Sequence, residues 1–265
     1  MGVDAERDSF VQKVREIDIE AVKRALEGGM DPNIADQHGT TALIEAAKGG
    51  HQEIVKLLLD KGADIEGRDE KFGGTALIWA ALGGHTETLD LLLESGADIN
   101  ATEDKNGMPA LILAAVQGHA DTIEKLLEKG ADIDSRDKDG RSPLMWASHH
   151  GHVAAVEVLI DRGADLEATD GRFGMTALMS AAVQNHTGTI EILLNRGAQI
   201  NARMKDRRTS LMLAALMGQA DTVRLLLESG AEINARDSNE NTALSLAKVH
   251  EKSDIVEILQ KAGAV

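Results

Sequence analysis

One glycine recurs along nearly the whole chain at an almost constant spacing. A period of 33 or 34 residues separates its successive positions. Periods of this length are typical of chains built from stacked supersecondary units, each of which buries its apolar face only against its neighbours. The repeat therefore argues against a single globular core. The recurring residues are Gly29, Gly62, Gly96, Gly130, Gly163, Gly197, Gly230 and Gly263.

Other residue types keep register with this glycine. A pair of apolar residues comes shortly before it, and Ala-Asp-Ile or a close variant follows it. Earlier in each unit, Thr-Ala-Leu precedes a pair of alanines. In the second unit these elements are Leu58-Leu59, Ala63-Asp64-Ile65, Thr41-Ala42-Leu43 and Ala46-Ala47.

The pattern predicts two short helices per unit. Thr41 is the type of residue that caps a helix N-terminus, because its hydroxyl accepts a hydrogen bond from a free backbone amide. Leu43, Ala46 and Ala47 then fall on one helical face, and the small alanines let a neighbouring helix approach closely.

The second helix of the same unit is expected from Glu53 to Lys61. We expect it to bury Ile54, Leu57 and Leu58. Gly62 follows it and is expected to adopt the left-handed conformation that commonly ends a helix.

These motifs resemble the ankyrin repeat family, whose repeat carries Thr-Pro-Leu-His, an alanine pair, Gly-His and Leu-Leu-x-x-Gly-Ala-Asp. Only Pro143 keeps the proline, and the histidine of the Leu-His step is replaced throughout, for example by Ile44. The resemblance covers nearly the whole chain. It implies an all-α fold, an ankyrin-repeat solenoid of eight helix-turn-helix units with β-turn fingertips.

The two ends of the sequence indicate capping repeats. Lys13, Lys248 and Gln260 stand where internal repeats carry small or apolar residues, and polar residues suit a face without a neighbour. We therefore expect an N-terminal capping repeat at 1–36, six internal repeats at 37–236 and a C-terminal capping repeat at 237–265, in one continuous solenoid.

The net charge of the chain limits the classes of partner that the sequence predicts. The formal net charge is −16, whereas nucleic-acid binding needs concentrated Lys and Arg, so nucleic acid is not expected as a ligand. A basic protein partner is favoured instead. No apolar run is long enough for a membrane span, so no membrane partner is expected. The start lacks the pattern of a signal peptide, which favours the cytoplasm; a secreted or periplasmic location stays open, because a removed signal leaves no trace.

Candidate chemistry is sparse. A histidine recurs once per repeat, and such a ladder cannot converge on one metal ion. The acidic turn residues Asp132, Asp134 and Asp137 lack the spacing of a calcium loop and are expected to be solvated. There is no cysteine, no phosphate-binding Gly-Lys-Ser/Thr and no Gly-x-Ser-x-Gly motif. The sequence therefore predicts no catalytic residue, metal site or cofactor, and no enzyme.

The first helices carry an unusual apolar row. Positions two and five after the leucine of Thr-Ala-Leu point roughly away from the core, and the resemblance implies that they face a concave groove. An exposed apolar row is typical of an interface, and tryptophan is a favoured anchor. The alternative, that the position-two side chains are core, stays open. The candidates are Trp79, Leu82, Leu113, Val116, Trp146, His149, Val183 and Leu216.

Three turns are one residue longer than the others, and two of them contain phenylalanine. The resemblance implies that Phe72 and Phe173 lie at fingertips beside the groove. The alternative is that each ring packs on a neighbouring turn. A basic segment at 203–208 replaces the usual turn residues and is interpreted as a solvated turn.

We therefore expect a monomeric protein-binding scaffold that docks an apolar helix or extended segment of a partner protein in this groove. A second hypothesis stays open, in which the same apolar row serves a structural role, self-assembly or support of a domain outside this sequence.

Overall fold

The computed structural model describes residues 2–265, with side chains described from Asp8 onward. Within this range the chain forms sixteen α-helices and no β-strand, which confirms the all-α prediction. The helices are α1 (Gly2–Arg15), α2 (Ile19–Glu27), α3 (Ala42–Lys48), α4 (Gln52–Asp60), α5 (Ala76–Leu82), α6 (Thr86–Glu94), α7 (Ala110–Gln117), α8 (Ala120–Glu128), α9 (Pro143–His149), α10 (Val153–Asp161), α11 (Ala177–Val183), α12 (Thr187–Asn195), α13 (Ser210–Met217), α14 (Ala220–Glu228), α15 (Ala243–Val249) and α16 (Ser253–Lys261).

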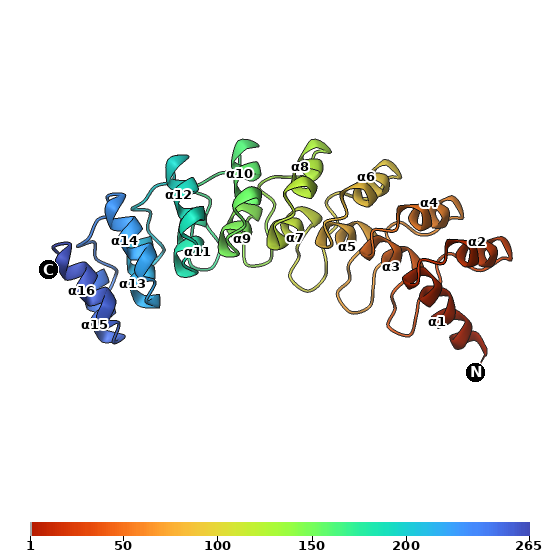
Figure 1. Ribbon diagram of the computed structural model, residues 1–265, viewed down its shortest axis with the longest axis horizontal. Coiled ribbons are helices and arrows are strands. Elements are labelled where there is room, and N and C mark those ends of the chain that lie inside the picture. The colour runs from red at the N-terminus through yellow and green to blue at the C-terminus, as the bar shows by residue number, and fades with distance from the viewer. Residues whose placement is uncertain (1) are drawn as a thin grey trace. The chain divides into compact units, whose positions relative to one another are not determined.

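The helices divide into two compact units. The first unit contains α1 to α8 and ends at Lys138, and the second contains α9 to α16 and begins at Asp139. Within each unit, every odd-numbered helix packs on the even-numbered helix that follows it. Consecutive odd-numbered helices also pack on one another, and so do consecutive even-numbered ones. Each unit is therefore a stack of four helix pairs in two layers (Figure 1).

The odd-numbered helices begin as the sequence predicts. Thr41 has extended backbone angles, and its hydroxyl accepts a hydrogen bond of 3.2 Å from the amide of Ile44. α7 differs, because Pro109 holds the capping position and has no side-chain acceptor. The same cap is made by Thr75, Ser142, Thr176, Thr209 and Thr242.

Small side chains fill the contact between odd-numbered helices. Leu43, Ala46 and Ala47 are all buried on one face of α3, as predicted, and the alanine pairs of α5, α7 and α11 are buried in the same way. Because an alanine carries only a methyl group, the backbones of successive helices approach closely. This contact aligns the next helix and repeats through each stack.

One detail of the second helices differs from the prediction. α4 runs from Gln52 to Asp60, and it buries Ile54, Val55 and Leu58, whereas Leu57 is only half-buried. The expectation that Leu57 is buried was therefore wrong. The buried face follows the spacing i, i+1, i+4, which places Leu57 at the edge of the face that packs on α3.

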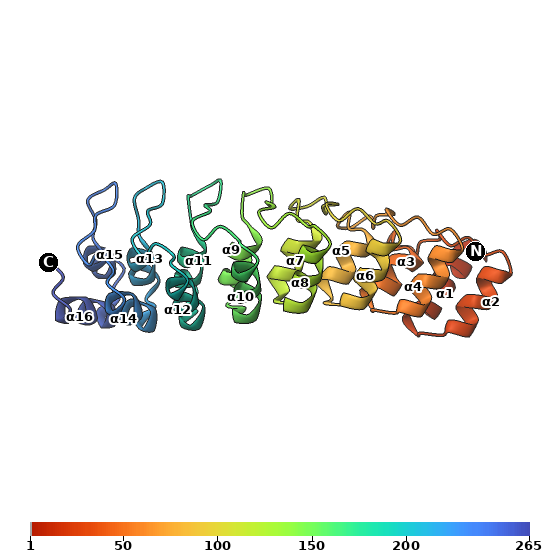
Figure 2. The same ribbon diagram turned by 90° about the horizontal axis from the view of Figure 1, so that it is seen from above.

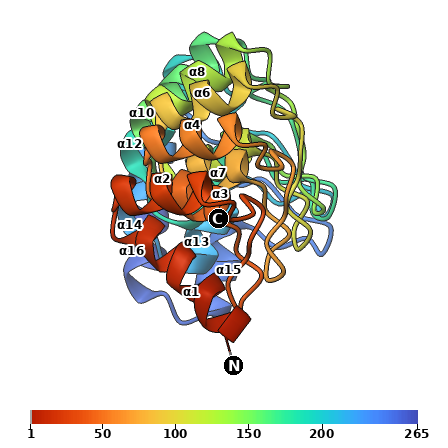
Figure 3. The same ribbon diagram turned by 90° about the vertical axis from the view of Figure 1, so that its right-hand side faces the viewer.

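Finger loops precede the odd-numbered helices; in the first unit they span 35–41, 68–75 and 102–109, and in the second 169–176, 203–209 and 236–242. Isolated antiparallel bridges close two of them, between Ala35 and Thr41 and between Thr102 and Pro109. In each unit the loops leave from the layer of odd-numbered helices (Figure 2). In the first unit they lie on the opposite side from α4 and α6 (Figure 3).

Single backbone hydrogen bonds join neighbouring finger loops. In the first unit, the amide of Asp104 donates to the carbonyl of Phe72 at 2.9 Å. In the second unit, the amide of Lys205 donates to the carbonyl of Phe173 at 3.0 Å. These bonds satisfy main-chain donors and acceptors of both loops. Side chains add to them, since Arg68 donates to the carbonyl of Thr102 and Lys205 to that of Gly171.

An acidic residue is buried at the base of most finger loops. Asp69 is 4% exposed, and its carboxylate accepts hydrogen bonds from the amides of Lys71, Phe72 and Gly74. Asp137 is also buried, so the expectation that it is solvated was wrong, whereas Asp132 and Asp134 are exposed. Folding the loop around a carboxylate satisfies amides that would otherwise lack acceptors. The buried acids are Asp36, Asp69, Glu103, Asp137, Asp170 and Asp237.

The repeated glycine has the conformation that the sequence predicts. Gly130 has φ +92°, and an added Cβ would find no atom within 4 Å. Replacing it with alanine therefore introduces backbone strain and no clash. We expect Gly130→Ala to lower the free energy of unfolding by about 1 kcal/mol, measured by urea denaturation.

Gly188 provides the matched control. It lies within α12, and an added Cβ would make only an ordinary contact with Val153. Gly188→Ala should be neutral or stabilising by up to about 1 kcal/mol, because alanine is the better helix former. Equal stability of Gly130→Ala and the unsubstituted chain would contradict the argument.

The boundaries of the capping repeats remain a prediction. Deleting residues 237–265 removes α15 and α16 and uncovers the surfaces of α13 and α14 on which they pack. We expect the shortened chain to melt at lower temperature and to associate, because apolar surface of the preceding repeat becomes exposed. Thermal melting and light scattering check this, and a monomer of unchanged stability would refute it.

Candidate functional site

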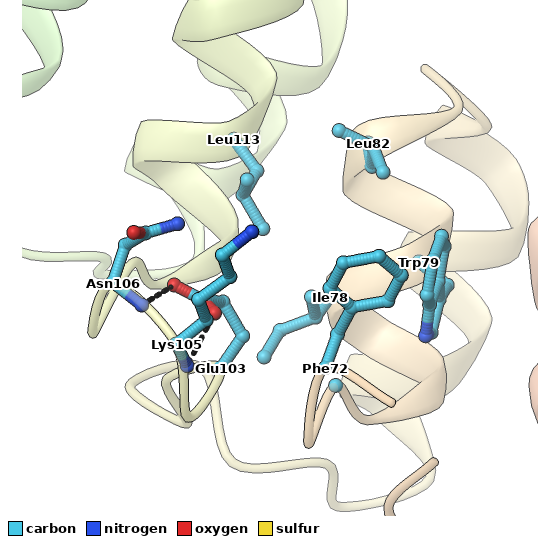
Figure 4. A pocket seen from close by; sticks show the side chains of 9 residues that line it. Phe72, Ile78, Trp79, Leu82, Glu103, Lys105, Asn106 and Leu113 are labelled. Atoms are coloured by element: carbon cyan, nitrogen blue, oxygen red, sulfur yellow. Dashed lines mark hydrogen bonds between the residues drawn. The ribbon is translucent and has the colours of Figure 1, made fainter. Parts of the chain in front are cut away.

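An apolar pocket opens on the odd-numbered layer of the first unit, between α5 and α7. It encloses about 190 Å³. One wall comes from α5 and the finger loop before it, and the other from α7 and the loop that precedes it (Figure 4). Residues on the two sides are Phe72, Ile78, Trp79, Leu82 and Leu113, with Glu103, Lys105 and Asn106 from the second loop.

Two aromatic rings form one side of this pocket. The Phe72 and Trp79 ring centroids are 5.7 Å apart with an interplanar angle of 70°, an edge-to-face arrangement. The indole Nε1 of Trp79 donates a hydrogen bond of 2.9 Å to Oδ2 of Asp69. The buried carboxylate therefore holds both the finger loop and the orientation of the tryptophan, whose ring stays half-buried.

The electrostatics of Asp69 follow from these contacts. Burial on its own would raise the pKa of the carboxyl group, but the hydrogen bonds from the Phe72 amide, the Trp79 indole and the Gly74 amide outweigh it. The pKa of Asp69 therefore lies below its ordinary value of 3.8. Asp69 is ionised at neutral pH and acts as an acceptor only.

Glu103 occupies the equivalent position in the next finger loop. Its carboxylate accepts hydrogen bonds of 2.7 Å from the amides of Lys105 and Asn106 (Figure 4). It also accepts one of 3.1 Å from the amide of Met108. Although Glu103 lines the pocket, its oxygens are turned to the backbone of its own loop. The carboxylate oxygens of Glu103 therefore already have hydrogen-bond donors within their own loop.

Lysines surround the aromatic rings of this pocket. The ammonium group of Lys48 lies 5.3 Å from the centroid of the Trp79 ring. Those of Lys71 and Lys105 lie 5.1 and 6.0 Å from the centroid of the Phe72 ring. Lys105 lines this pocket, whereas Lys48 and Lys71 line an adjoining cavity that also contains Glu45 and Glu70. The aromatic faces stabilise these cations.

The second unit has a pocket at the equivalent place, between α9 and α11. It encloses about 200 Å³. The guanidinium of Arg141 lies 4.8 Å from the centroid of the Trp146 ring, so a cation again covers the tryptophan. Other lining residues are Met145, His149, Asp170, Met175, Ser180, Val183 and Leu213.

Histidines crowd one side of this second pocket. The rings of His149 and His150 are 5.0 Å apart, and the ring of His150 stacks on Trp146 at 5.8 Å. Burial, followed by the positive charges of His150 and Arg141, lowers the pKa of His149 below its ordinary value. At neutral pH the imidazole of His149 is therefore uncharged.

The histidine that recurs once per repeat has a structural role. Nε2 of His85 lies 2.9 Å from the carbonyl oxygen of Lys48 in the preceding repeat, and His119 makes the same contact with Leu82 at 3.1 Å. Gln219 substitutes for the histidine and donates to the carbonyl of Val183 at 2.9 Å. Among the residues with described side chains, no three His, Cys, Asp or Glu residues are placed to hold a metal ion. Within the same part of the chain, no helix is long and apolar enough to cross a membrane.

The structure gathers most of the predicted site residues around the two pockets. Phe72, Trp79, Leu82 and Leu113 line the first, and Trp146, His149 and Val183 line the second. The other three predicted residues lie outside these linings: Val116 and Leu216 are half-buried on α7 and α13, and Phe173 is 43% exposed, with Arg172 4.9 Å from its ring centroid.

At position two after the leucine of each first helix, some side chains belong to the core, as the alternative interpretation proposed, and others do not. Ser180, Leu213 and Leu246 are buried, whereas Trp79 and Trp146 are half-buried. Sequence reasoning did not single out Ile78 and Met145, because they sit one residue from the row and belong to the packed face. It also did not single out the lysines beside the rings: Lys48 ends α3 at position five after Leu43, and Lys71 and Lys105 lie in finger loops.

Asp69 offers a test of the first pocket's architecture. Asp69→Asn should lower the free energy of unfolding at pH 7 by about 1–3 kcal/mol, because an amide cannot accept all the hydrogen bonds that the carboxylate accepts. The folded pKa is depressed, so the ionised group stabilises the fold above pH ~4, and this contribution is lost as the pH falls through the folded pKa.

The difference between Asp69→Asn and the unsubstituted chain should therefore shrink between pH 5 and pH 3 in urea denaturation. Glu53→Gln, which neutralises an exposed acid on α4, should change stability by less than about 0.5 kcal/mol. A stability difference that does not depend on pH would show that Asp69 is not the charged acceptor described here.

Comparisons with known proteins agree with this architecture. A family model described as ankyrin repeats in three copies matches residues 11–103, 100–170, 167–237 and 204–265. An ankyrin repeat-containing protein of Schizosaccharomyces pombe (strain 972 / ATCC 24843) is 42% identical to this chain over 51 residues. That match covers 19% of this chain and 25% of the yeast protein, so the chain matches only about a quarter of this curated relative.

Ankyrin repeats are in general protein–protein interaction modules, and the family is typically non-catalytic. The family model covers nearly all of the sequence, over which the structure describes eight helix pairs. The chain belongs to the ankyrin repeat family.

Proposed function

We propose that this chain is a protein-binding scaffold that docks partner proteins on its layer of odd-numbered helices and on the adjoining finger loops. One observation carries the proposal: in each unit, a half-buried tryptophan lines an apolar pocket on this layer. The proposal applies to each unit separately, with one pocket as the anchor point in each.

The composition of the pockets supports binding over a purely structural role. Leu82 and Leu113 keep part of their apolar surface in water, although the helices that carry them are packed on both sides. Exposed apolar surface grouped in a concave site is characteristic of ligand and protein contacts. Tryptophan is also over-represented among the residues that contribute most to binding energy.

The rigidity of the pocket walls supports the same conclusion. Trp79 is held by a hydrogen bond to Asp69, and the finger loop that carries Phe72 is joined to the next loop through its backbone. A preformed site loses little conformational entropy when a partner binds. We infer that the apolar anchor of a partner enters an existing cavity.

Paired substitutions test the proposal. Leu82→Ser removes apolar surface from the first pocket, and Val183→Ser removes it from the second. Partner proteins captured from cells with the unsubstituted chain should bind at least ~30-fold more weakly to one of these variants, the effect expected for a binding hot spot. Quantitative capture followed by titration of each recovered protein provides the measurement.

Leu57→Ser is the matched control, because Leu57 is also half-buried but lies on α4 in the even-numbered layer. It should leave binding unchanged, and the melting temperatures of all three variants should stay close together. Partners that bind both pocket variants as tightly as the unsubstituted chain would refute the proposed docking surface.

A further inference from the structure

Lysines lie beside the aromatic rings of the first pocket. Lys48, Lys71 and Lys105 come from α3 and two finger loops, and their ammonium groups lie within 5.1–6.0 Å of the ring centroids of Trp79 and Phe72. Figure 4 shows the side chain of Lys105 rising from its loop toward the pocket. Lys105 lines the apolar cavity, and Lys48 and Lys71 line an adjoining cavity beside the same rings, in a chain whose formal net charge is −16.

These lysines retain capacity to bind an anion. Within residues 8–265, for which the structure describes side chains, none of the three forms a salt bridge with a carboxylate. Arg68 shows the contrast, since it lies in the same loop and pairs with Asp104 at 3.1 Å. A lysine above an aromatic face still directs its N–H donors elsewhere, because the ammonium group carries three of them.

The acidic residues closest to the apolar pocket are engaged. Asp69 and Glu103 are buried and accept hydrogen bonds from their own loops. Asp104 pairs with Arg68. Glu70 lines the adjoining cavity with Lys48 and Lys71. Lys105 is therefore the charged side chain of the apolar pocket that is open to an anion, because the carboxylate of Glu103 faces its own loop.

The helix of the other layer that packs on α5 is acidic. α5 and α7 contain no charged residue, whereas α6 carries Glu87, Asp90 and Glu94 and no basic residue. The net charge of the whole chain suggested a basic partner. The local distribution separates the acidic surface of α6 from an apolar pocket that Lys105 lines on the odd-numbered layer.

We infer that the first pocket binds an acidic segment of a partner protein, with one apolar side chain in the cavity and neighbouring carboxylates on Lys71 and Lys105. This inference rests on the proposed function, because it names the partner chemistry for the same docking surface. The apolar side chain removes the walls of the pocket from water, and the carboxylates meet the cations beside its rings. Desolvation by the anchor strengthens the ion pairs beside it.

The second unit carries the same combination of groups. Arg141 lies over Trp146, and Arg172 lies 4.9 Å from the ring centroid of Phe173. Phe72, Trp79, Trp146 and Phe173 therefore each have a cation over or beside the ring. The recurrence at equivalent positions argues that the pairing of apolar surface with positive charge is a property of this binding layer.

A selection experiment on the full chain tests the inference. Short random peptides displayed on phage are selected against the unsubstituted chain, and the binders are sorted by whether Leu82→Ser abolishes their binding. We expect the pocket-dependent binders to carry Asp or Glu next to an apolar residue. Their affinity should fall as the salt concentration rises, because exposed ion pairs are screened.

Charge reversal then identifies the groups responsible. The double variant Lys71→Glu/Lys105→Glu should bind the selected synthetic peptides about tenfold more weakly or worse, from the loss of two ion pairs and the added repulsion. The control Lys56→Glu/Lys61→Glu makes the same change in net charge at exposed positions of α4 and just after it. It should change affinity by no more than about twofold.

The outcomes separate the two claims. Acidic, pocket-dependent peptides that lose affinity only in the Lys71→Glu/Lys105→Glu variant support the inference. Pocket-dependent peptides that are neutral or basic, or acidic ones that the charge reversal leaves unchanged, overturn the inference and leave the docking surface intact. If no selected peptide responds to Leu82→Ser, both the inference and the proposed docking role of this pocket fail.

Discussion

The close contact between consecutive odd-numbered helices determines most of what this molecule presents to a partner. Alanines such as Ala46 and Ala47 are fully buried in that contact, and their small size brings successive first helices together. A lone helix pair cannot bury enough apolar surface to offset its loss of conformational entropy, so this contact also makes the repeats mutually dependent. The pockets exist because two neighbouring helices are held at this spacing, with larger side chains on the side that faces away from the alanines.

The buried acids at the bases of the finger loops connect folding with recognition. Asp69 accepts hydrogen bonds from three backbone amides and from the indole of Trp79. The same carboxylate that closes the loop therefore sets the angle of the pocket's largest ring. Glu103 closes the next loop with its longer side chain and orients Lys105 and Asn106. The geometry of the pocket is thus inherited from the folding of the loops, without a separate set of supporting residues.

The periodic features of the structure could be predicted from the sequence, and the local contacts could not. The glycine period, the threonine caps and the alanine pairs each depend on interactions within one repeat or between identical positions of neighbours, so pattern alone reveals them. The burial of Asp137 was not predicted, because an acidic residue in a turn is usually solvated. Its burial depends on how the loop backbone folds around the carboxylate, and the sequence pattern does not show this. The expected burial of Leu57 was wrong because the packed face of α4 is centred on Ile54, Val55 and Leu58 and leaves Leu57 at its edge, a rotation of the helix that the apolar pattern alone does not reveal.

The main-chain bonds between finger loops have a consequence for how such a protein diversifies. The bond from Asp104 to Phe72 and the bond from Lys205 to Phe173 use no side-chain atoms. Side chains cross between the same loops as well, since Arg68 donates to the carbonyl of Thr102 and Lys205 to that of Gly171. Exchange of a residue at a loop tip therefore keeps the main-chain bond available while it alters the chemistry offered to a partner, so new specificities arise by local exchanges, one repeat at a time.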